Sequence, residues 1–285
     1  MKNPALTTNE MKALAQISHE KMGYRDAFFD LEDGFGVVAL HHIKVTSRID
    51  SYFRDLFSKK VETKNTQDLD DKMTVGVVQF LARDKNSKEI TDFTMIWQKK
   101  YLSQPICVSV SKKLGKIAVG LDNGDIYLYN FDASNPKSKE NIEEVHLPKA
   151  HSARVMKITF DEVRERLLSI CDDKKLRVTI IKTKEAESSL KSFDKGLTDM
   201  QYNQKNQLLI AADSGNNIYT VVVNGNLPNV TCKVKLECEG PIRGLDVDWE
   251  DGYIFACSFG DGIISVLKSN DIFDGVSTRV LTLER

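Results

Sequence analysis

One arrangement of short β-type runs around a tight turn recurs along residues 106–267, and this repeat constrains the fold more than any other feature. In each unit, two apolar runs precede a turn rich in Asp, Asn, Lys and Gly, and a third apolar run follows it. When the turns are aligned, position 124 matches 174, 215 and 262, at spacings of 50, 41 and 47 residues. Repeats of about 40–50 residues that hold four strands each are typical of β-propeller blades.

The turns of this repeat use residues that accept a positive φ angle, as tight β-hairpins require. Acidic residues recur at the turns once per unit. This indicates turn chemistry, because a pair of catalytic carboxylates would not be duplicated in every unit. We therefore interpret the following as structural residues at blade turns and blade contacts: Asp122, Gly124, His151, Asp173, Asp213, Gly215, Asp261 and Gly262. No catalytic, cofactor-binding or metal-binding residue is predicted.

The sequence thus predicts an all-β protein, a propeller of about five recognisable blades across residues 34–285. A single four-stranded sheet cannot bury both of its faces, whereas sheets stacked against neighbouring sheets can. A turn at 70–72, ahead of an apolar run at 73–80, and an expected strand at 35–45 extend the pattern toward the N-terminus. Five blades leave three possibilities open: a five-bladed ring, an open ring, or a ring that a partner chain completes or covers.

Two helices are predicted outside the repeat. Residues 1–33 form an N-terminal helical arm, in which Thr7 and Glu10 make a capping box and Gly23 ends the helix. The second helix is an insertion at about 47–60, with large apolar side chains at i, i+3, i+4, i+7 and i+8. These residues are Ile49, Tyr52, Phe53, Leu56 and Phe57. We expect the stripe either to pack against the propeller or to anchor a partner protein, because buried aromatic residues supply much of the affinity of an interface.

Several of these runs resemble WD40 repeats. Ala150-His151 occupies the place of the family's Gly-His dipeptide, and residues 167–178 resemble the family's second and third strands with the turn between them. Tyr129-Asn130 stands where the family has Trp-Asp. The resemblance covers about residues 70–270, and the nearest likeness is to the WD40 part of WD-repeat-and-FYVE proteins. It implies a propeller fold.

The chain departs from this family at the hydrogen-bond network of Asp, His, Ser or Thr, and Trp that joins WD40 blades. The Trp is missing, with Thr179 in its place in one unit and Leu267 in another, and only one unit keeps both His151 and Asp173. We therefore expect the blades to depend more on apolar packing. The FYVE module is absent as well, because its two zinc sites would need eight ligands of the cysteine type and the chain has five separated cysteines.

The composition narrows the classes of function. The formal net charge is −1, so the chain lacks the basic excess that nucleic acids select. Five cysteines at irregular spacings disfavour a disulfide framework and fit a reducing compartment. No apolar run reaches the roughly 20 residues of a transmembrane helix. His41 and His42 are adjacent in an expected strand, so they point to opposite faces and do not suit one metal ion.

These observations predict a non-enzymatic scaffold or adaptor subunit that mediates protein–protein interactions in a multiprotein assembly and needs no cofactor. The partners would be other proteins of that assembly. The expected location is the cytoplasm, where cytoskeletal and ciliary assemblies both stay open. The alternative is a membrane-trafficking adaptor that binds a phosphoinositide or coat components, and this alternative predicts a basic pocket on the rim of one blade.

Overall fold

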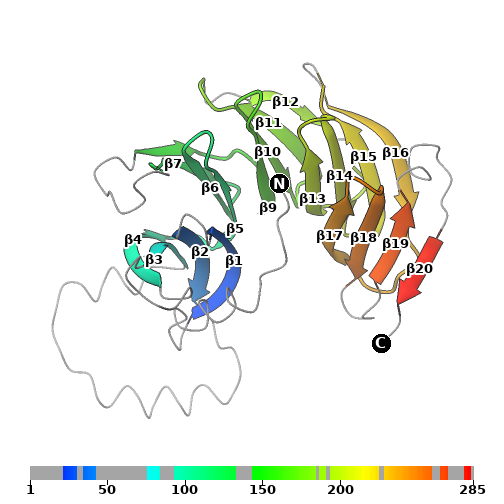
Figure 1. Cartoon of the computed structure of the whole chain (residues 1–285), viewed down its shortest axis with the longest axis horizontal. Coiled ribbons are helices and arrows are strands. Elements are labelled where there is room, and N and C mark those ends of the chain that lie inside the picture. Colours follow the sequence, from blue (N-terminus) through cyan, green and yellow to red (C-terminus); the bar gives the residue numbers. More distant parts are fainter. Residues whose placement is uncertain are drawn as a thin grey trace, which may run out of the picture. The chain divides into compact units, whose positions relative to one another are not determined.

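A computed structural model describes the strands of the chain and many of the turns between them (Figure 1). The described residues are 22–30, 35–42, 76–83, 93–132, 143–183, 186–190, 193–224, 228–258, 264–268 and 279–283. Every regular element within these ranges is a β-strand. This part of the chain accordingly has no helix long and apolar enough to cross a membrane. The predicted inserted helix lies outside the described residues, as does the predicted N-terminal helix up to residue 21.

The strands form five four-stranded sheets, in which strands that follow one another in sequence pair side by side (Figure 1). The first sheet consists of β1 (Met22–Asp30), β2 (Phe35–His42), β3 (Gly76–Arg83) and β4 (Phe93–Tyr101). The second consists of β5 (Pro105–Ser111), β6 (Lys116–Leu121), β7 (Ile126–Asn130) and β8 (Glu144–Leu147). The third consists of β9 (Val155–Asp161), β10 (Arg166–Cys171), β11 (Lys175–Ile180) and β12 (Ala186–Leu190).

The last two sheets follow the same plan. The fourth consists of β13 (Leu197–Asn203), β14 (Leu208–Asp213), β15 (Asn217–Val222) and β16 (Asn229–Lys235). The fifth consists of β17 (Ile242–Asp248), β18 (Tyr253–Ser258), β19 (Ile264–Lys268) and β20 (Arg279–Leu283). Five sheets of four consecutive strands confirm the predicted all-β fold class with its five blade-like units. The first sheet belongs to one compact unit of the chain, and the four later sheets belong almost entirely to a second.

The N-terminal boundary of the first sheet differs from the prediction. Strand β1 lies within residues 1–33, which the sequence assigns to a helical arm, and it pairs with β2 from Met22↔His42 to Asp30↔Phe35. The predicted boundary at residue 34 is therefore wrong, and the sheet begins at Met22. Aromatic residues favour strands, and the rings of Phe28 and Phe35 lie 5.7 Å apart across the hairpin. The prediction failed because Gly23 was interpreted as the end of a helix, whereas it lies in strand β1.

The first turn of each later sheet contains a structural repeat that the sequence analysis missed. The last residue of the first strand accepts a hydrogen bond from the backbone N–H three residues later, at 3.2–3.3 Å. The accepting side chains belong to Ser111, Asp161, Asn203 and Asp248. Four residues after each of them the backbone has a positive φ, between 52° and 76°, at Gly115, Glu165, Gln207 and Gly252. This repeated geometry shows that the four sheets are built alike, although the residue types vary.

The second turn of each sheet corrects the alignment made from the sequence. The residue with a positive φ is Gly124 in the second sheet, Lys174 in the third and Asn216 in the fourth. Position 216 therefore matches 124 and 174, because Asn216 N donates to Asp213 O as Gly124 N donates to Leu121 O. The prediction that used Gly215 is one residue out of register. Asn also tolerates a left-handed backbone, so the Gly beside it is a misleading marker.

Apolar side chains pack between successive sheets of the second unit. One cluster joins the second and third sheets and includes Ala118, Ile126, Val155 and Ile158. A second cluster joins the third and fourth sheets and includes Leu168, Ile170, Met200 and Leu209. A third joins the fourth and fifth sheets and includes Ile210, Ile218, Leu245 and Ile254. Each sheet between two others thus buries both faces, as stacked blades require.

Two close contacts set the spacing of these sheets. A Cβ atom added to Gly120 of β6 would lie 2.7 Å from Val155 Cγ1, so only glycine lets β9 approach this closely. Asp199 of β13 accepts hydrogen bonds from Lys157 Nζ of β9, at 2.5 Å, and from the backbone N–H of Leu245 in β17, at 2.7 Å. One carboxylate therefore links the first strands of three sheets.

Replacement of Gly124 by Ala tests the turn geometry. Gly124 has a φ of 90°, and a Cβ atom there would lie 2.2 Å from the backbone oxygen of His151. We expect Gly124→Ala to lower the free energy of unfolding by about 3 kcal/mol, measured by urea denaturation. The matched control is Gly244→Ala, because the nearest heavy atom to its added Cβ is 3.6 Å away and its φ is unstrained. A Gly124→Ala protein as stable as this control would contradict the requirement for glycine at this turn.

Candidate functional site

A groove of about 550 Å³ opens beside the connection between β8 and β9. Its walls come from that connection, from the turn between β6 and β7, and from strands β11 and β12. The lining residues are Asn123, Lys149, Ala150, His151, Ser152, Lys175, Arg177 and Ser189. Three of them are Lys or Arg and none is acidic, so the groove is a positively charged depression between the second and third sheets.

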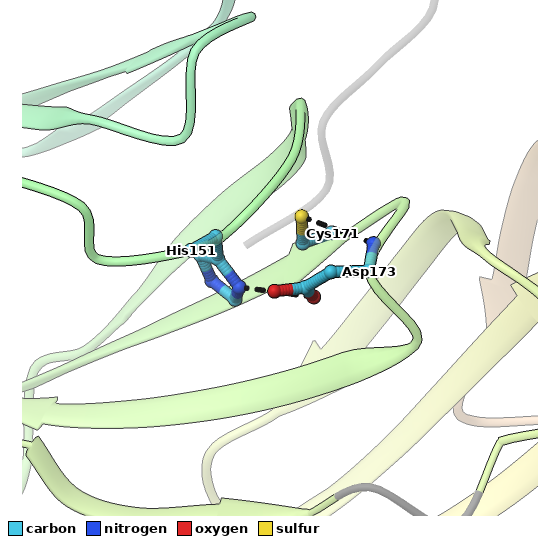
Figure 2. A group of neighbouring side chains, drawn as sticks. All are labelled: His151, Cys171 and Asp173. Atoms are coloured by element: carbon cyan, nitrogen blue, oxygen red, sulfur yellow. Dashed lines mark hydrogen bonds and ion pairs between the residues drawn. The ribbon is translucent and has the colours of Figure 1, made fainter.

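A buried pair, His151 and Asp173, supports one wall of this groove (Figure 2). His151 Nδ1 lies 3.4 Å from Asp173 Oδ1, and His151 Nε2 lies 2.8 Å from Ser169 Oγ. Asp173 also accepts hydrogen bonds from the backbone N–H and the hydroxyl of Ser152, both at 3.0 Å. The pair therefore fastens the β8–β9 connection to the β10–β11 turn. Three members of the WD40 network are present here, and Thr179 occupies the place of the fourth.

The electrostatics of this cluster keep its acid ionised and its thiol protonated. Burial alone would raise the pKa of the Asp173 carboxyl, but contacts with His151 and the Ser152 N–H outweigh it and hold that pKa well below its usual range. Burial, strengthened by the neighbouring Asp173 carboxylate, raises the pKa of the Cys171 thiol to about 12. Cys171 Sγ lies 3.1 Å from the Ala153 carbonyl oxygen, to which the thiol donates.

His151, Cys171 and Asp173 also bring together the kinds of atom that bind zinc. One ligand atom from each residue lies within 4.8 Å of the other two. Figure 2 shows the three side chains next to one another. The thiol of Cys171, however, already donates a hydrogen bond to the Ala153 carbonyl oxygen. Asp173 N–H donates to Cys171 Sγ at 3.2 Å, and the other two side chains have the partners given above. The arrangement suits a hydrogen-bonded network better than a metal site.

The three cations of the groove are held in different ways. Arg177 Nη1 donates to the Ala150 carbonyl oxygen, and its buried Nε has no acceptor among the described residues. Lys149 has a positive φ of 49°, and its backbone N–H donates to Asp125 Oδ1 at 2.7 Å. Lys175 Nζ lies 3.3 Å from Asp173 Oδ2. Arg177 and Lys175 are thus positioned by the same connection and turn that the His151–Asp173 pair fastens.

The structure brings some predicted blade-turn residues together and separates others. His151 and Asp173 are in contact, and His151 N donates to the carbonyl oxygen of Gly124 at 3.0 Å. The acidic residues that recur once per unit, Asp122, Asp173 and Asp213, do not occupy one equivalent place in the structure. Asp122 is the first residue of its turn, Asp173 is the second, and Asp213 is the last residue of strand β14.

Asp213 has a different set of partners from Asp173. It is fully buried and accepts hydrogen bonds from the Asn217 backbone N–H at 3.0 Å and from the Tyr219 hydroxyl at 2.8 Å. Gly215 N–H donates to the same carboxylate at 2.9 Å. Asp213 also accepts a hydrogen bond from the Lys195 backbone N–H at 3.2 Å, so it ties the connection between β12 and β13 to this turn, and neither Asp213 nor Gly215 lines the groove.

Other predicted residues lie outside the described part of the chain. These are Asp261, Gly262, Ile49, Tyr52, Phe53, Leu56 and Phe57. The cations Lys149, Lys175 and Arg177 were missed by the sequence analysis. A signal existed for Arg177, which alternates with the buried Leu176 and Val178 on β11, but its proximity to Lys149 depends on how two sheets meet.

Comparisons with solved structures identify the class of fold. The chain is similar to Sqt1 of Chaetomium thermophilum, crystallised with the N-terminus of the ribosomal protein L10, with a TM-score of 0.59 and 14% identity over 73% of this chain and 56% of that one. It is similar to the WD40 β-propeller domain of Doa1, with a TM-score of 0.61 and 15% identity over 94% of this chain and 70% of that one. The fold is that of the WD40 β-propellers, and the chain matches little more than half of the Sqt1 chain.

The sequence itself gives no closer assignment. No family model and no curated protein matches it. The finer resemblance to WD-repeat-and-FYVE proteins stays a prediction, because the two structures above are other WD40 proteins.

Replacement of Asp173 by Ala tests the network beside the groove. The substitution leaves the Ser152 N–H and His151 without their acceptor, so we expect the free energy of unfolding to fall by about 2–3 kcal/mol. The folded-state pKa of Asp173 is lowered, so its stabilising contribution is complete above the unfolded pKa of about 3.9 and is lost as the pH falls below it. The difference between the wild type and Asp173→Ala should therefore shrink below about pH 4, as measured by urea denaturation across the acid range.

The matched control for this experiment is Asp251→Ala, at an exposed turn position in the fifth sheet. We expect it to change the free energy of unfolding by less than about 0.5 kcal/mol at any of these pH values. A pH-independent difference for Asp173→Ala would show that the carboxylate is not stabilised by the network.

Proposed function

We propose that this chain is a non-enzymatic scaffold or adaptor subunit that binds other proteins in a multiprotein assembly. The observation that carries this proposal is a groove between two propeller sheets, lined by exposed and half-buried polar side chains and held by a buried hydrogen-bond network. Such a surface is rigid before a partner arrives, which reduces the entropy that binding must overcome. Rigid sheets that present clefts and turns to solvent are well suited to protein recognition.

The structural neighbours support this proposal. The Sqt1 structure contains the N-terminus of the ribosomal protein L10, so one protein of this fold binds a segment of another protein. We infer that the present chain likewise accepts a segment of a partner, and the groove is the candidate place for it.

The chemistry of the buried cluster supports a non-enzymatic role. A catalytic cysteine acts as a thiolate beside a base, whereas Cys171 is buried and has a pKa of about 12. Asp173 is engaged by Ser152, His151 and Lys175, and it is not among the residues that line the groove. These residues act as supports for the groove.

A membrane-trafficking adaptor that binds a phosphoinositide or coat components is the second candidate. The observation that favours it is the same set of cations, because this function predicts a basic pocket at the rim of one blade. Flotation of the chain with vesicles that contain phosphatidylinositol phosphates tests it. Flotation equal to that with phosphatidylcholine vesicles would remove this candidate.

The proposal also covers the N-terminal third of the chain, the cellular location of the assembly and a covering partner. We propose that the arm and the stripe of apolar residues at 49–57 supply further partner contacts, and that the assembly is cytoplasmic, with cytoskeletal or ciliary assemblies as examples. A partner that completes or covers the propeller belongs to the same proposal.

Crosslinking mass spectrometry of the tagged full chain, purified with its partners from cells, tests the scaffold function. We expect stoichiometric partners in native mass spectra and crosslinks from Lys149 and Lys175 to those partners. Lys205, an exposed residue in a turn of the fourth sheet, is the internal control and should crosslink less. A chain that stays monomeric and without partners would contradict the proposal.

A double substitution tests the apolar stripe. We expect Tyr52→Ser with Phe53→Ser to remove a partner from the purified complex while the thermal midpoint of the isolated chain stays within about 2 °C. Lys59→Ala, in the same segment, is the control and should retain all partners. A large loss of thermal stability in the double variant would instead show that the stripe packs within the chain.

A further inference from the structure

We propose that the basic groove recognises a phosphate group carried on a segment of a partner protein. This inference rests on the proposed protein-binding function and adds the chemical class of the ligand. It assigns Lys149, Lys175 and Arg177 as the residues that contact the phosphate, with the exposed Ser189, the cross-strand partner of Arg177, as a neutral hydrogen-bond donor beside them.

The charge of the groove matches a phosphate better than a single carboxylate. Lys149 and Arg177 form no ion pair within the part of the chain that the structure describes, whereas Lys175 forms an ion pair with Asp173. The positive charges of Lys149 and Arg177 are therefore not neutralised by an ion pair, and no acidic residue lines the groove. A phosphorylated side chain carries a charge of about −1.5 to −2 at neutral pH.

The placement of Arg177 adds a second, independent observation. Its Nη1 is fixed to the Ala150 carbonyl oxygen, while its buried Nε lacks an acceptor among the described residues. That buried Nε is out of reach of a ligand in the groove, which leaves Nη2 as the guanidinium nitrogen that can donate to a phosphate oxygen.

The surroundings of the groove favour a peptide over a membrane surface. A flat anionic bilayer would lie against Asp122, Asp125 and Asp172 of the bordering turns, whereas a single phosphate contacts only the residues that line the groove, none of which is acidic. The large apolar side chains that are exposed in the described residues are Met95, Leu102, Val163, Phe255 and Ile264, and none of them lines the groove. Insertion into a bilayer needs such side chains beside the basic site. A single phosphorylated residue on an extended segment can enter where a flat membrane cannot.

Fluorescence anisotropy with three labelled peptide pools tests the proposal on the full chain. The pools have degenerate flanks and a fixed central phosphoserine, glutamate or serine. We expect the phosphoserine pool to bind at least about tenfold more tightly than the serine pool, with glutamate between them. Lys149→Gln and Arg177→Gln should each weaken binding of the phosphoserine pool by about tenfold, and Lys205→Gln should leave it unchanged.

Two further measurements make the outcomes decisive. Because Arg177 contacts the backbone, the thermal midpoint of each variant is measured, and the exposed Lys149→Gln carries the test if Arg177→Gln unfolds. Vesicles of phosphatidylcholine with phosphatidylinositol phosphate form the second arm. Equal binding of the three pools, insensitivity to Lys149→Gln, or binding of the vesicles alone would overturn the proposal. If no peptide pool binds the wild type but partners still copurify with Lys149→Gln, the phosphate inference is wrong. The proposed scaffold function is then still supported.

Discussion

Burial of both faces of a thin sheet is the constraint on which this structure depends. Four strands are too few to form a core of their own, so each sheet of the second unit is stabilised by the sheets beside it. The apolar clusters between the second, third, fourth and fifth sheets supply most of that stabilisation. The absence of a side chain at Gly120 and the shared carboxylate of Asp199 fix how closely neighbouring sheets approach.

Polar contacts have a different task in this fold: they hold the connections that apolar packing does not reach. The His151–Asp173 pair ties the β8–β9 connection to a turn of the third sheet, and the Ser169 hydroxyl forms a hydrogen bond with the second imidazole nitrogen. Two of the groove cations, Arg177 and Lys175, contact this same framework through Ala150 and Asp173. A positively charged groove therefore forms where two sheets meet, beside residues that a hydrogen-bond network holds in place.

Prediction from sequence succeeded where a local pattern is enough and failed where residues had to be aligned in space. The apolar runs and their spacing predicted the strands of the repeat and the five units. The same alignment misplaced Gly215 by one residue, since Asn216 adopts the positive φ. The alignment also missed the side-chain hydrogen bond that recurs in the first turn of each later sheet, at Ser111 and Asp161 among others. Ser and Asp can both accept this bond, but they are different residue types and do not align by sequence. Strand β1 was missed because Gly23 was interpreted as the end of a helix, whereas in the structure Gly23 pairs with His41 of β2.

The sequence by itself determined that this chain is a stack of four-stranded sheets, since alternating apolar runs and tight turns at regular spacing leave few other ways to bury them. It also singled out His151 and Asp173, which the structure brings into contact. Only the tertiary structure decided that Lys149, Lys175 and Arg177 line one groove. Those residues come from a connection and from the third strand of the following sheet. The way in which the second and third sheets pack together determines how close these three cations lie. That packing depends on apolar contacts between the sheets, and the spacing of the three cations in the sequence does not reveal it.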